Sequence, residues 1–458
     1  MFNNLRNTDL HEFYKKMFTL GLPIIIQNLV STTLNMVDTV MISSQGEAAL
    51  AAVAIANKYV FILIVFLFGI YSGTSIFISQ YYCAKDYKNI HNVLGIGIML
   101  GVTVCLAFFG LAFLAPEFVM GIFIEDTEVI RLGSIYLRIV SLSYLAMTLS
   151  FAFSHGSRNV HRTKVPMASS IIALCLNTSL NYLLIDGNFG FPMWGVKGAA
   201  IATLVARIAE LLILFVFIYS DSEHPLRASF RELFGFTQDL FKKIIKVITP
   251  VIINEGVWAV GTSMYYIAYG KLGANSMAAM QVSMTLTDFC WAIFMGVGGS
   301  AAVLIGNEIG KGEATKSYNY SKSVLVLGVS IAVGVGLIMI GLSPFLGLVF
   351  KLSEETLKIA MQCVIVMALY MPVRNFNYIM FSSVLRSGGD TTFCMVVDAS
   401  SVWLIGVPLT FAAVAFFPIG IPLLMAVSYS EEIVKALIVY KRFVSKKWMN
   451  NLVDVKLM

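Results

Sequence analysis

About twelve apolar stretches, each roughly 20 to 30 residues long, constrain the fold of this chain most. A helix rises 1.5 Å per residue, so each stretch can cross a hydrocarbon core of about 30 Å. The chain is 58% hydrophobic and 13% charged, with a mean hydropathy of +0.81, and such a composition cannot cover a water-soluble protein with polar surface. We therefore predict an all-α membrane protein. The twelve transmembrane helices are expected near 17–43, 51–81, 92–115, 129–154, 165–185, 195–219, 243–269, 276–309, 320–343, 357–383, 393–416 and 419–441.

The second half of the chain repeats the first. Pro23 pairs with Pro250 and Gly46 with Gly273 at one constant offset, and Arg158 pairs with Arg386 at an offset longer by a single position. Many secondary transporters consist of two such copies that rock against each other around a central cavity. We predict two pseudo-symmetric six-helix lobes: an N-lobe at 1–219, a cytoplasmic linker at 220–242, and a C-lobe with a cytoplasmic tail at 243–458. The spacing of apolar residues from Ser220 to Phe241 favours an amphipathic helix on the inner membrane surface.

The basic residues lie mostly on one side of the predicted bundle, so the net charge of +6 does not indicate nucleic-acid binding. The basic residues of the predicted outer loops are Arg131, Lys197, Lys271, Lys351 and Lys358. An excess of Lys and Arg in the inner segments orients a membrane protein. We therefore expect a multi-pass protein of the cytoplasmic membrane with both termini in the cytoplasm. The polar residues before Met17 indicate no cleavable signal peptide, so the first span should direct insertion.

The pattern of short connections excludes several functional classes. The short loops between the spans leave no room for a nucleotide-binding or catalytic domain, so uphill transport would need an ion gradient. The stretch Gly306–Gly312 lacks the spacing of a phosphate-binding loop, and the six cysteines show no spacing typical of metal sites or disulfides. We expect a protein that is not an enzyme and has no cofactor. It should be a monomer that contacts membrane lipid and transports small-molecule substrates.

Four oxygen-bearing side chains are expected at one depth in the first half. Asp38 lies toward the outer end of the first span, and Asn177 and Asn181 share one face of the fifth. Thr203 lies about six residues below the outer end of the sixth span, which brings it to the same level. A carboxylate, two amides and a hydroxyl suit a small hard cation such as Na⁺, whereas Asp38 alone suits a proton. The alternative is a set of interhelical hydrogen bonds.

The second half carries ionisable residues that a membrane span rarely tolerates. Glu255 is near the middle of the seventh span, and Arg374 is at a similar depth in the tenth. Ionisable residues at this depth usually face a cavity or pair with one another. Either Glu255 and Arg374 form a buried ion pair, or Glu255 faces a cavity that holds a cationic substrate. The further candidates for lining this cavity are Met36, Tyr265 and Tyr266, because thioether and aromatic groups bind apolar cations.

Several motifs together resemble the multidrug and toxic compound extrusion (MATE) transporters. They are Pro23-x3-Gln27, Asn35-Met-Val-Asp38, Asn177-x3-Asn181-Tyr-Leu-Leu-Ile185, Gly195-Val-Lys-Gly198 followed by Thr203, and Leu385-Arg386-Ser-Gly-Gly389-Asp390-Thr391. The resemblance extends over nearly the whole chain and implies a twelve-helix, V-shaped antiporter. Such a protein exports organic cations, drugs or toxic metabolites in exchange for Na⁺ or H⁺.

The resemblance also implies roles for particular residues. Asp38, Asn177, Asn181 and Thr203 match the first-span aspartate of the family and its polar partners, and Glu255 matches a glutamate found in some members. Some members have a second aspartate where this chain has Asn181, and some have an acid near the position of Arg374. A lipid-linked oligosaccharide flippase of the same broad superfamily is the alternative. It would need a large basic cavity, for which the chief candidate at cavity depth is Arg374.

Overall fold

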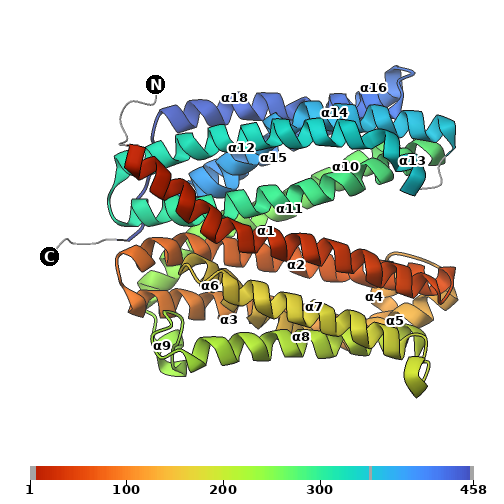
Figure 1. The fold of residues 1–458 in the computed structure, drawn as a ribbon, viewed down its shortest axis with the longest axis horizontal. Helices are drawn as coiled ribbons and strands as arrows, with labels where there is room; N and C mark the ends of the chain where they lie inside the picture. Colours follow the sequence, from red (N-terminus) through yellow and green to blue (C-terminus); the bar gives the residue numbers. More distant parts are fainter. Residues whose placement is uncertain (1–6, 350–352, 454–458) are drawn as a thin grey trace. The chain divides into compact units, whose positions relative to one another are not determined.

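The computed structural model describes residues 7–349 and 353–453, and in these ranges it contains helices and no β-strand (Figure 1). The chain divides into two compact units. Residues Ile26–Lys246 form one, called here the N-terminal unit, and Met1–Ile25 with Val247–Met458 form the other, the C-terminal unit. The prediction of an all-α fold is confirmed. The start of the chain, through Ile25, groups with the second half, which the repeat did not indicate.

The N-terminal unit is a bundle of long antiparallel helices (Figure 1). The first helix, α1 (Asn7–Ser43), enters this unit after Ile25. The other elements are α2 (Glu47–Cys83), α3 (Tyr87–Leu114), α4 (Pro116–Gly121), α5 (Thr127–Ser141), α6 (Tyr144–Asn159), α7 (Lys164–Leu184), η1 (Asn188–Gly190), α8 (Gly195–Ser220) and α9 (Phe230–Phe234).

The C-terminal unit repeats this bundle with more irregular helices. The first helix, α10 (Gln238–Gly270), enters this unit at Val247. The other elements are α11 (Ala274–Gly310), α12 (Ala314–Leu342), η2 (Ser343–Phe345), α13 (Leu346–Val349), α14 (Glu354–Ile379), η3 (Met380–Leu385), η4 (Arg386–Gly388), α15 (Thr391–Ser401), η5 (Val402–Gly406), α16 (Val407–Phe416), α17 (Ile421–Tyr429) and α18 (Glu431–Val444). Two of these segments, η3 and η5, are π-helical. Such segments are rare and often accompany functional sites.

The internal repeat is visible in the backbone of three turns. Gly46 between α1 and α2 has φ 94°, and Gly273 between α10 and α11 has φ 91°. The same correspondence joins Lys85 (φ 56°) with Gly312 (φ 82°), and His161 (φ 62°) with Gly389 (φ 73°). Positive φ is uncommon for residues other than glycine. Its recurrence at the offsets of the sequence repeat shows that the two halves share a chain path as well as sequence.

The apolar helices account for the predicted spans. Ten of the described helices are long and apolar enough to cross a membrane, and α5 with α6, bent by 51° at a short break, provide an eleventh. The predicted twelfth span, 419–441, is occupied by α17 and α18, which meet at Ser430. Large apolar side chains remain exposed on these helices, as lipid contact requires; examples are Val40, Leu114, Val216, Leu369 and Leu404.

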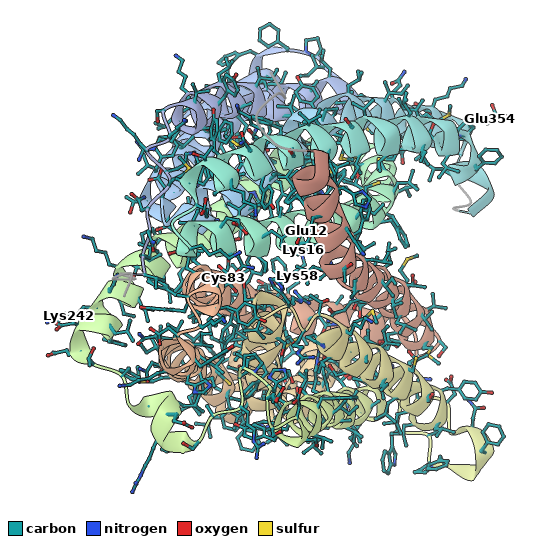
Figure 2. All side chains as sticks on the ribbon, turned by 60° about the vertical axis from the view of Figure 1, so that its left-hand side comes forward. Glu12, Lys16, Lys58, Cys83, Lys242 and Glu354 are labelled. Carbon is teal, nitrogen blue, oxygen red and sulfur yellow. The ribbon has the colours of Figure 1, made fainter. Side chains whose placement is uncertain are left out.

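Small residues let the start of α1 approach α11 closely. A Cβ atom on Gly296 would lie 2.2 Å from Cγ1 of Ile25 and 3.0 Å from the carbonyl oxygen of Gly21. Gly296 and Ser300 have the small-xxx-small spacing that allows helix backbones to meet. On the same stretch of α1, Glu12 and Lys16 form an ion pair one turn apart, with 2.6 Å between Nζ and Oε1 (Figure 2).

The polar segment after α8 is not the long amphipathic helix expected from its sequence. Between Asp221 and Thr237 only α9 is helical, because Pro225 disfavours a helix before it and a capping box formed by Ser229 and Glu232 starts the helix at Phe230. His224 is buried, its Nδ1 accepts a hydrogen bond from the Leu226 amide (3.2 Å), and burial lowers its pKa to about 4. Leu233 packs its backbone against α3 at Gly95, where a Cβ atom would lie 1.8 Å from the Leu233 carbonyl oxygen. Lys242 then lies on the first turns of α10 (Figure 2).

Candidate functional site

Three of the predicted ion-coupling residues form one hydrogen-bonded chain with Asp38 in the N-terminal unit. Asn181 on α7 donates from Nδ2 to Oδ1 of Asp38 on α1 over 3.0 Å, and its Nδ2 also lies 3.4 Å from Oδ1 of Asn177. Asn177 in turn donates to Oγ1 of Thr203 on α8 over 3.5 Å. The helical spacing that places both amides on one face of α7 brings them to the two neighbouring helices. The structure therefore brings these four side chains together at one level.

The hydrogen-bonded residues from Asp38 to Thr203 have mostly polar neighbours and are partly shielded from solvent. The Oγ1 atom of Thr178 lies 3.5 Å from the same carboxylate oxygen of Asp38, and Asn177 and Asn181 are both buried. The Oδ1 atom of Asn181 is buried without a hydrogen-bond partner, so one acceptor beside the carboxylate is left over. A carboxylate, a hydroxyl and a spare amide oxygen at such distances can accept a small cation or a proton. No group of three or more His, Cys, Asp or Glu side chains suited to a metal ion occurs within 7–349 and 353–453.

A second polar chain in the N-terminal unit links four helices. The Arg158 guanidinium donates to Oε1 of Gln27 over 2.8 Å, and Nε2 of Gln27 donates to Oγ of Ser170 over 2.7 Å. Ser170 donates to Glu210 over 2.6 Å, and Glu210 also accepts from Arg207 over 2.9 Å. Arg207 and Glu210 are three residues apart on α8, and they form a local ion pair, as this spacing on a helix allows.

Glu255 forms a buried ion pair in the C-terminal unit, but its partner is Arg386 (2.8 Å) instead of Arg374. The π-helical segment η3 adds a residue to the helical turn before Arg386, so its direction could not be derived from a regular helix. Arg374 packs its guanidinium over the rings of Tyr429 (4.6 Å) and Trp291 (5.5 Å). The pair of Glu255 and Arg386 is the counterpart of Gln27 and Arg158 in the other unit. Glu255 follows Gln27 at the same offset at which Arg386 follows Arg158.

A cluster of four charged residues in the C-terminal unit was not singled out from the sequence. The ammonium group of Lys435 on α18 lies 2.8 Å from Asp398 on α15 and 3.6 Å from both Glu431 and Glu432. Asn377 on α14 donates to Oε2 of Glu432 over 2.7 Å. A signal was present, because Glu431, Glu432 and Lys435 all fall inside the predicted span 419–441. The four charged residues of this cluster are called the Lys435 cluster below.

The residues proposed to line a substrate cavity differ in exposure. Met36 is 42% exposed and Tyr266 is 40% exposed, so both present apolar surface. Tyr265 is only 6% exposed, and its hydroxyl lies in the interior of the C-terminal unit. Its role in contacting substrate stays a prediction that this arrangement does not support.

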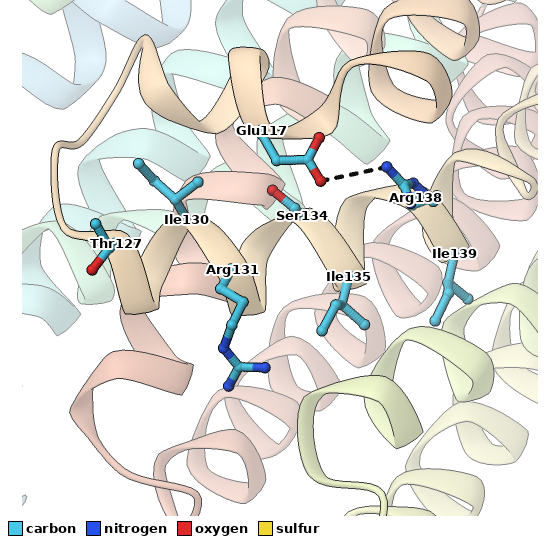
Figure 3. A pocket seen from close by; sticks show the side chains of 8 residues that line it. All are labelled: Glu117, Thr127, Ile130, Arg131, Ser134, Ile135, Arg138 and Ile139. Atoms are coloured by element: carbon cyan, nitrogen blue, oxygen red, sulfur yellow. Dashed lines mark hydrogen bonds and ion pairs between the residues drawn. The ribbon is translucent and has the colours of Figure 1, made fainter.

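A surface pocket of about 540 Å³ lies elsewhere in the N-terminal unit, beside α4 and α5 (Figure 3). Arg138 and Glu117 pair across it over 3.4 Å, whereas Arg131 pairs with Glu128. Isoleucine side chains line much of the rest. The pocket contains none of the residues predicted to couple transport to an ion, and its charged groups already neutralise one another.

Comparisons with known proteins agree with the fold. The family model described as MatE matches residues 23–183 and 250–412. The chain is 25% identical to "Uncharacterized transporter YisQ" of Bacillus subtilis, with 94% of each chain covered. It is 23% identical to "Probable multidrug resistance protein NorM" of Thermotoga maritima, with 97% of this chain and 95% of the relative covered.

Solved structures share the architecture at low sequence identity. A structure described as "Crystal structure of MATE in complex with MaL6" has a TM-score of 0.86 at 17% identity, covering 94% of this chain and 97% of that one. A transporter of the MOP superfamily from Pyrococcus furiosus has a TM-score of 0.84 at 18% identity, covering 94% and 96%. At this identity the likeness concerns the fold alone. It agrees with twelve transmembrane helices in two lobes.

Proposed function

Because this chain belongs to the MatE family of membrane transporters, we propose that it is a cation-coupled antiporter that exports organic cations, drugs or toxic metabolites. The coupling ion would be Na⁺ or H⁺. The observation that carries the proposal is the hydrogen-bonded chain from Asp38 through Asn181 and Asn177 to Thr203. The multidrug resistance proteins among the relatives support the proposed class of substrate.

Asp38 would be the group that senses the ion. Bound Na⁺ or H⁺ neutralises its carboxylate, which changes the balance of hydrogen bonds that hold α1 against α7. An ion shifts a conformational equilibrium only if it binds one state more tightly than the other. Asn177, Asn181 and Thr203 would supply the additional oxygen ligands that favour the ion-bound arrangement. Ion release then returns the carboxylate to Asn181.

Substrate contacts would come from exposed aromatic and thioether groups. In the C-terminal unit, Tyr266 offers apolar surface to a cationic ligand and Glu255 would supply the attractive charge. Met36 offers an apolar thioether surface in the N-terminal unit. The pairing of Glu255 with Arg386 reduces that attraction unless the pair opens. A lipid-linked oligosaccharide flippase is not favoured, since Arg374 is packed between aromatic rings and Arg386 is paired.

The test is exchange by purified protein in lipid vesicles. Efflux of a fluorescent organic cation should follow an imposed Na⁺ gradient or pH gradient, and Asp38→Asn should reduce that exchange to the background of empty vesicles. Asn keeps the size of the side chain and one acceptor oxygen, but it replaces the other oxygen with a donor NH₂ group and removes the charge. Insertion and melting temperature should stay near those of the native protein.

A matched control is Asp186→Asn, which changes an exposed carboxylate in the turn after α7 that accepts from Gln45 over 2.9 Å. This variant should keep its exchange rate within about twofold. Normal ion-driven efflux by the Asp38→Asn variant would reject the proposed role of Asp38.

A further inference from the structure

Three carboxylates of the Lys435 cluster surround a single ammonium group inside the C-terminal unit. Lys435, Glu431 and Asp398 are 3%, 4% and 8% exposed, so little water can solvate their charges. A buried charge without a partner is strongly unfavourable, and two carboxylates in close contact disfavour ionisation of both. One lysine cannot balance three carboxylates, so the cluster needs further positive charge.

The neighbouring cations supply only part of that charge. Arg374 interacts electrostatically with Glu431 and Glu432, and Arg386 interacts with Asp398 but is itself paired with Glu255. The facing carboxylates are Asp398, Glu431, Glu432 and Glu255, and the facing cations are Lys435, Arg374 and Arg386. Four carboxylates against three cations leave one negative charge in excess. A single proton would balance the set.

Two buried oxygen atoms mark the place where such a proton would be held. The hydroxyl of Tyr265 and Oε2 of Glu431 are both buried and interact with each other, and Oε2 also lies 3.6 Å from Nζ of Lys435. Both side chains face Gly406: a Cβ atom there would lie 1.9 Å from the Tyr265 hydroxyl and 3.3 Å from Cγ of Glu431. Gly406 ends the π-helical segment η5, where the irregular backbone leaves space for these two side chains. A proton on Oε2 of Glu431 is accommodated at this point, because the Tyr265 hydroxyl can accept a hydrogen bond as well as donate one.

The internal repeat places this pair at the positions of the ion-coupling site. Tyr265 follows Asp38 at the offset that relates Gly46 to Gly273, and Glu431 follows Thr203 at the offset that relates Arg158 to Arg386. In the N-terminal unit the acid, Asp38, is on α1 and the hydroxyl, Thr203, is on α8. In the C-terminal unit the hydroxyl, Tyr265, is on α10 and the acid, Glu431, is on α18. The acid and the hydroxyl have exchanged helices between the two copies.

We propose that the Lys435 cluster binds one exchangeable proton on Glu431, beside the Tyr265 hydroxyl, as a second site separate from Asp38. Lys435 occupies the position between the carboxylates that an alkali ion would otherwise take, so the ligand is a proton. Binding forms one O–H bond on Glu431 and breaks none in the protein. The site depends neither on the direction of transport nor on the ion bound at Asp38.

Infrared spectroscopy of the purified protein during a pH titration tests the site directly, through the stretching band of protonated carboxyl groups. In the native protein, part of this band should disappear as pH rises. The variant Glu431→Gln mimics the protonated side chain, so it should lack one carboxyl equivalent of that change. Exposed carboxyl groups in general are ionised above about pH 6, so above that pH the exposed control Glu47→Gln should titrate as the native protein does. An unchanged band in Glu431→Gln would overturn the proposal.

A second variant keeps the test decisive if Glu431→Gln does not fold. Lys435→Gln leaves four carboxylates facing two cations, so the band should grow by about one carboxyl equivalent. The double variant Glu431→Gln/Lys435→Gln should return it to the native amplitude. Loss of the native band on adding Na⁺ or K⁺ at constant pH would mean that the cluster binds an alkali ion, which also contradicts the proposal. Asp38→Asn efflux measurements do not bear on these outcomes.

Discussion

Asp38 and Glu431 illustrate how differently one carboxyl group behaves in the two copies of the bundle. Asp38 has amide and hydroxyl neighbours, with 3.0 Å to Asn181 and 3.5 Å to Thr178. Glu431 lies among other charges, with Lys435 3.6 Å away. A carboxylate held by neutral donors responds to an arriving cation, whereas one in a crowded anionic cluster responds to proton concentration.

The variant Asn181→Asp tests how the neutral amide sets ion preference. It places a second carboxylate about 3 Å from Asp38, and two acids at that distance cannot both ionise, so they share a proton. The ratio of Na⁺-driven to pH-driven efflux in vesicles should fall at least about tenfold. To bind, Na⁺ must now displace the shared proton, and this raises the free energy of Na⁺ binding by on the order of 1.4 kcal/mol.

The control for this variant is Asn188→Asp, in the exposed turn η1, where the side chain donates to the Tyr182 carbonyl. Its ratio should stay at the native value. An unchanged ratio in Asn181→Asp would show that Asn181 does not influence the choice of ion.

Regular helices made the candidate ion site predictable from the sequence, whereas irregular helices hid the charge pairs of the C-terminal unit. Asp38, Asn177, Asn181 and Thr203 could be placed together because α1, α7 and α8 are regular, so depth follows from residue number. The partner of Glu255 could not, since Arg386 follows the π-helical segment η3. The Lys435 cluster combines residues of α15 and α18, and no single span revealed it as a cluster.

The packing of α9 against α3 depends on the close approach of the Leu233 backbone to Gly95. The Leu233 carbonyl oxygen would lie 1.8 Å from a Cβ atom on Gly95, so only glycine permits the observed packing. We expect Gly95→Ala to displace α9, because overpacking of this kind costs typically about 1–3 kcal/mol. Trypsin should then cleave at Arg227 or Arg231, both exposed, about tenfold faster than in the native protein.

Gly110→Ala is the matched control on the same helix, because nothing lies within 4 Å of its added Cβ atom. It should keep the native cleavage rate and gain roughly 0.5–1 kcal/mol of helix stability. Equal cleavage rates in both variants would mean that Gly95 does not hold α9 in place.

Helix periodicity predicted the elements with unequal success. Spans without interruption matched the observed helices within several residues, as α7 and α8 do. The segment after α8 did not, since apolar spacing cannot reveal that Pro225 and the Ser229–Glu232 capping box reduce the helix to five residues. The break between α5 and α6 at Leu142–Ser143 likewise has no proline or glycine to announce it.

At the scale of the whole molecule, the uneven distribution of basic residues makes a prediction about orientation. In a variant with Cys83 and Cys175, the two cysteines that are not buried, replaced by Ala, a membrane-impermeant thiol reagent should label Glu125→Cys on intact cells. It should label Lys242→Cys only after the membrane is permeabilised, because Lys and Arg are retained on the cytoplasmic side. Neither position is buried, so accessibility within the protein does not limit the reaction. The reverse labelling pattern would place the termini outside.

The internal repeat predicted the division into two similar halves, and the matched turns at Gly46 and Gly273 have the same backbone conformation. It described two similar halves, but it did not assign the segment Met1–Ile25 to the C-terminal unit. That grouping follows from packing of α1 on α11 near Gly296, a contact between distant parts of the sequence.

The break at Ser430 has a consequence for how the protein is made. A charge at the centre of an isolated helix costs roughly 2.5–3.5 kcal/mol during translocon-mediated integration, and α18 begins with Glu431 and Glu432 and carries Lys435 one turn later. Their partners are on α14 and α15, which the ribosome has already synthesised. Docking of α18 onto α14 and α15 offsets part of this cost, which couples membrane integration of α18 to assembly of the C-terminal unit.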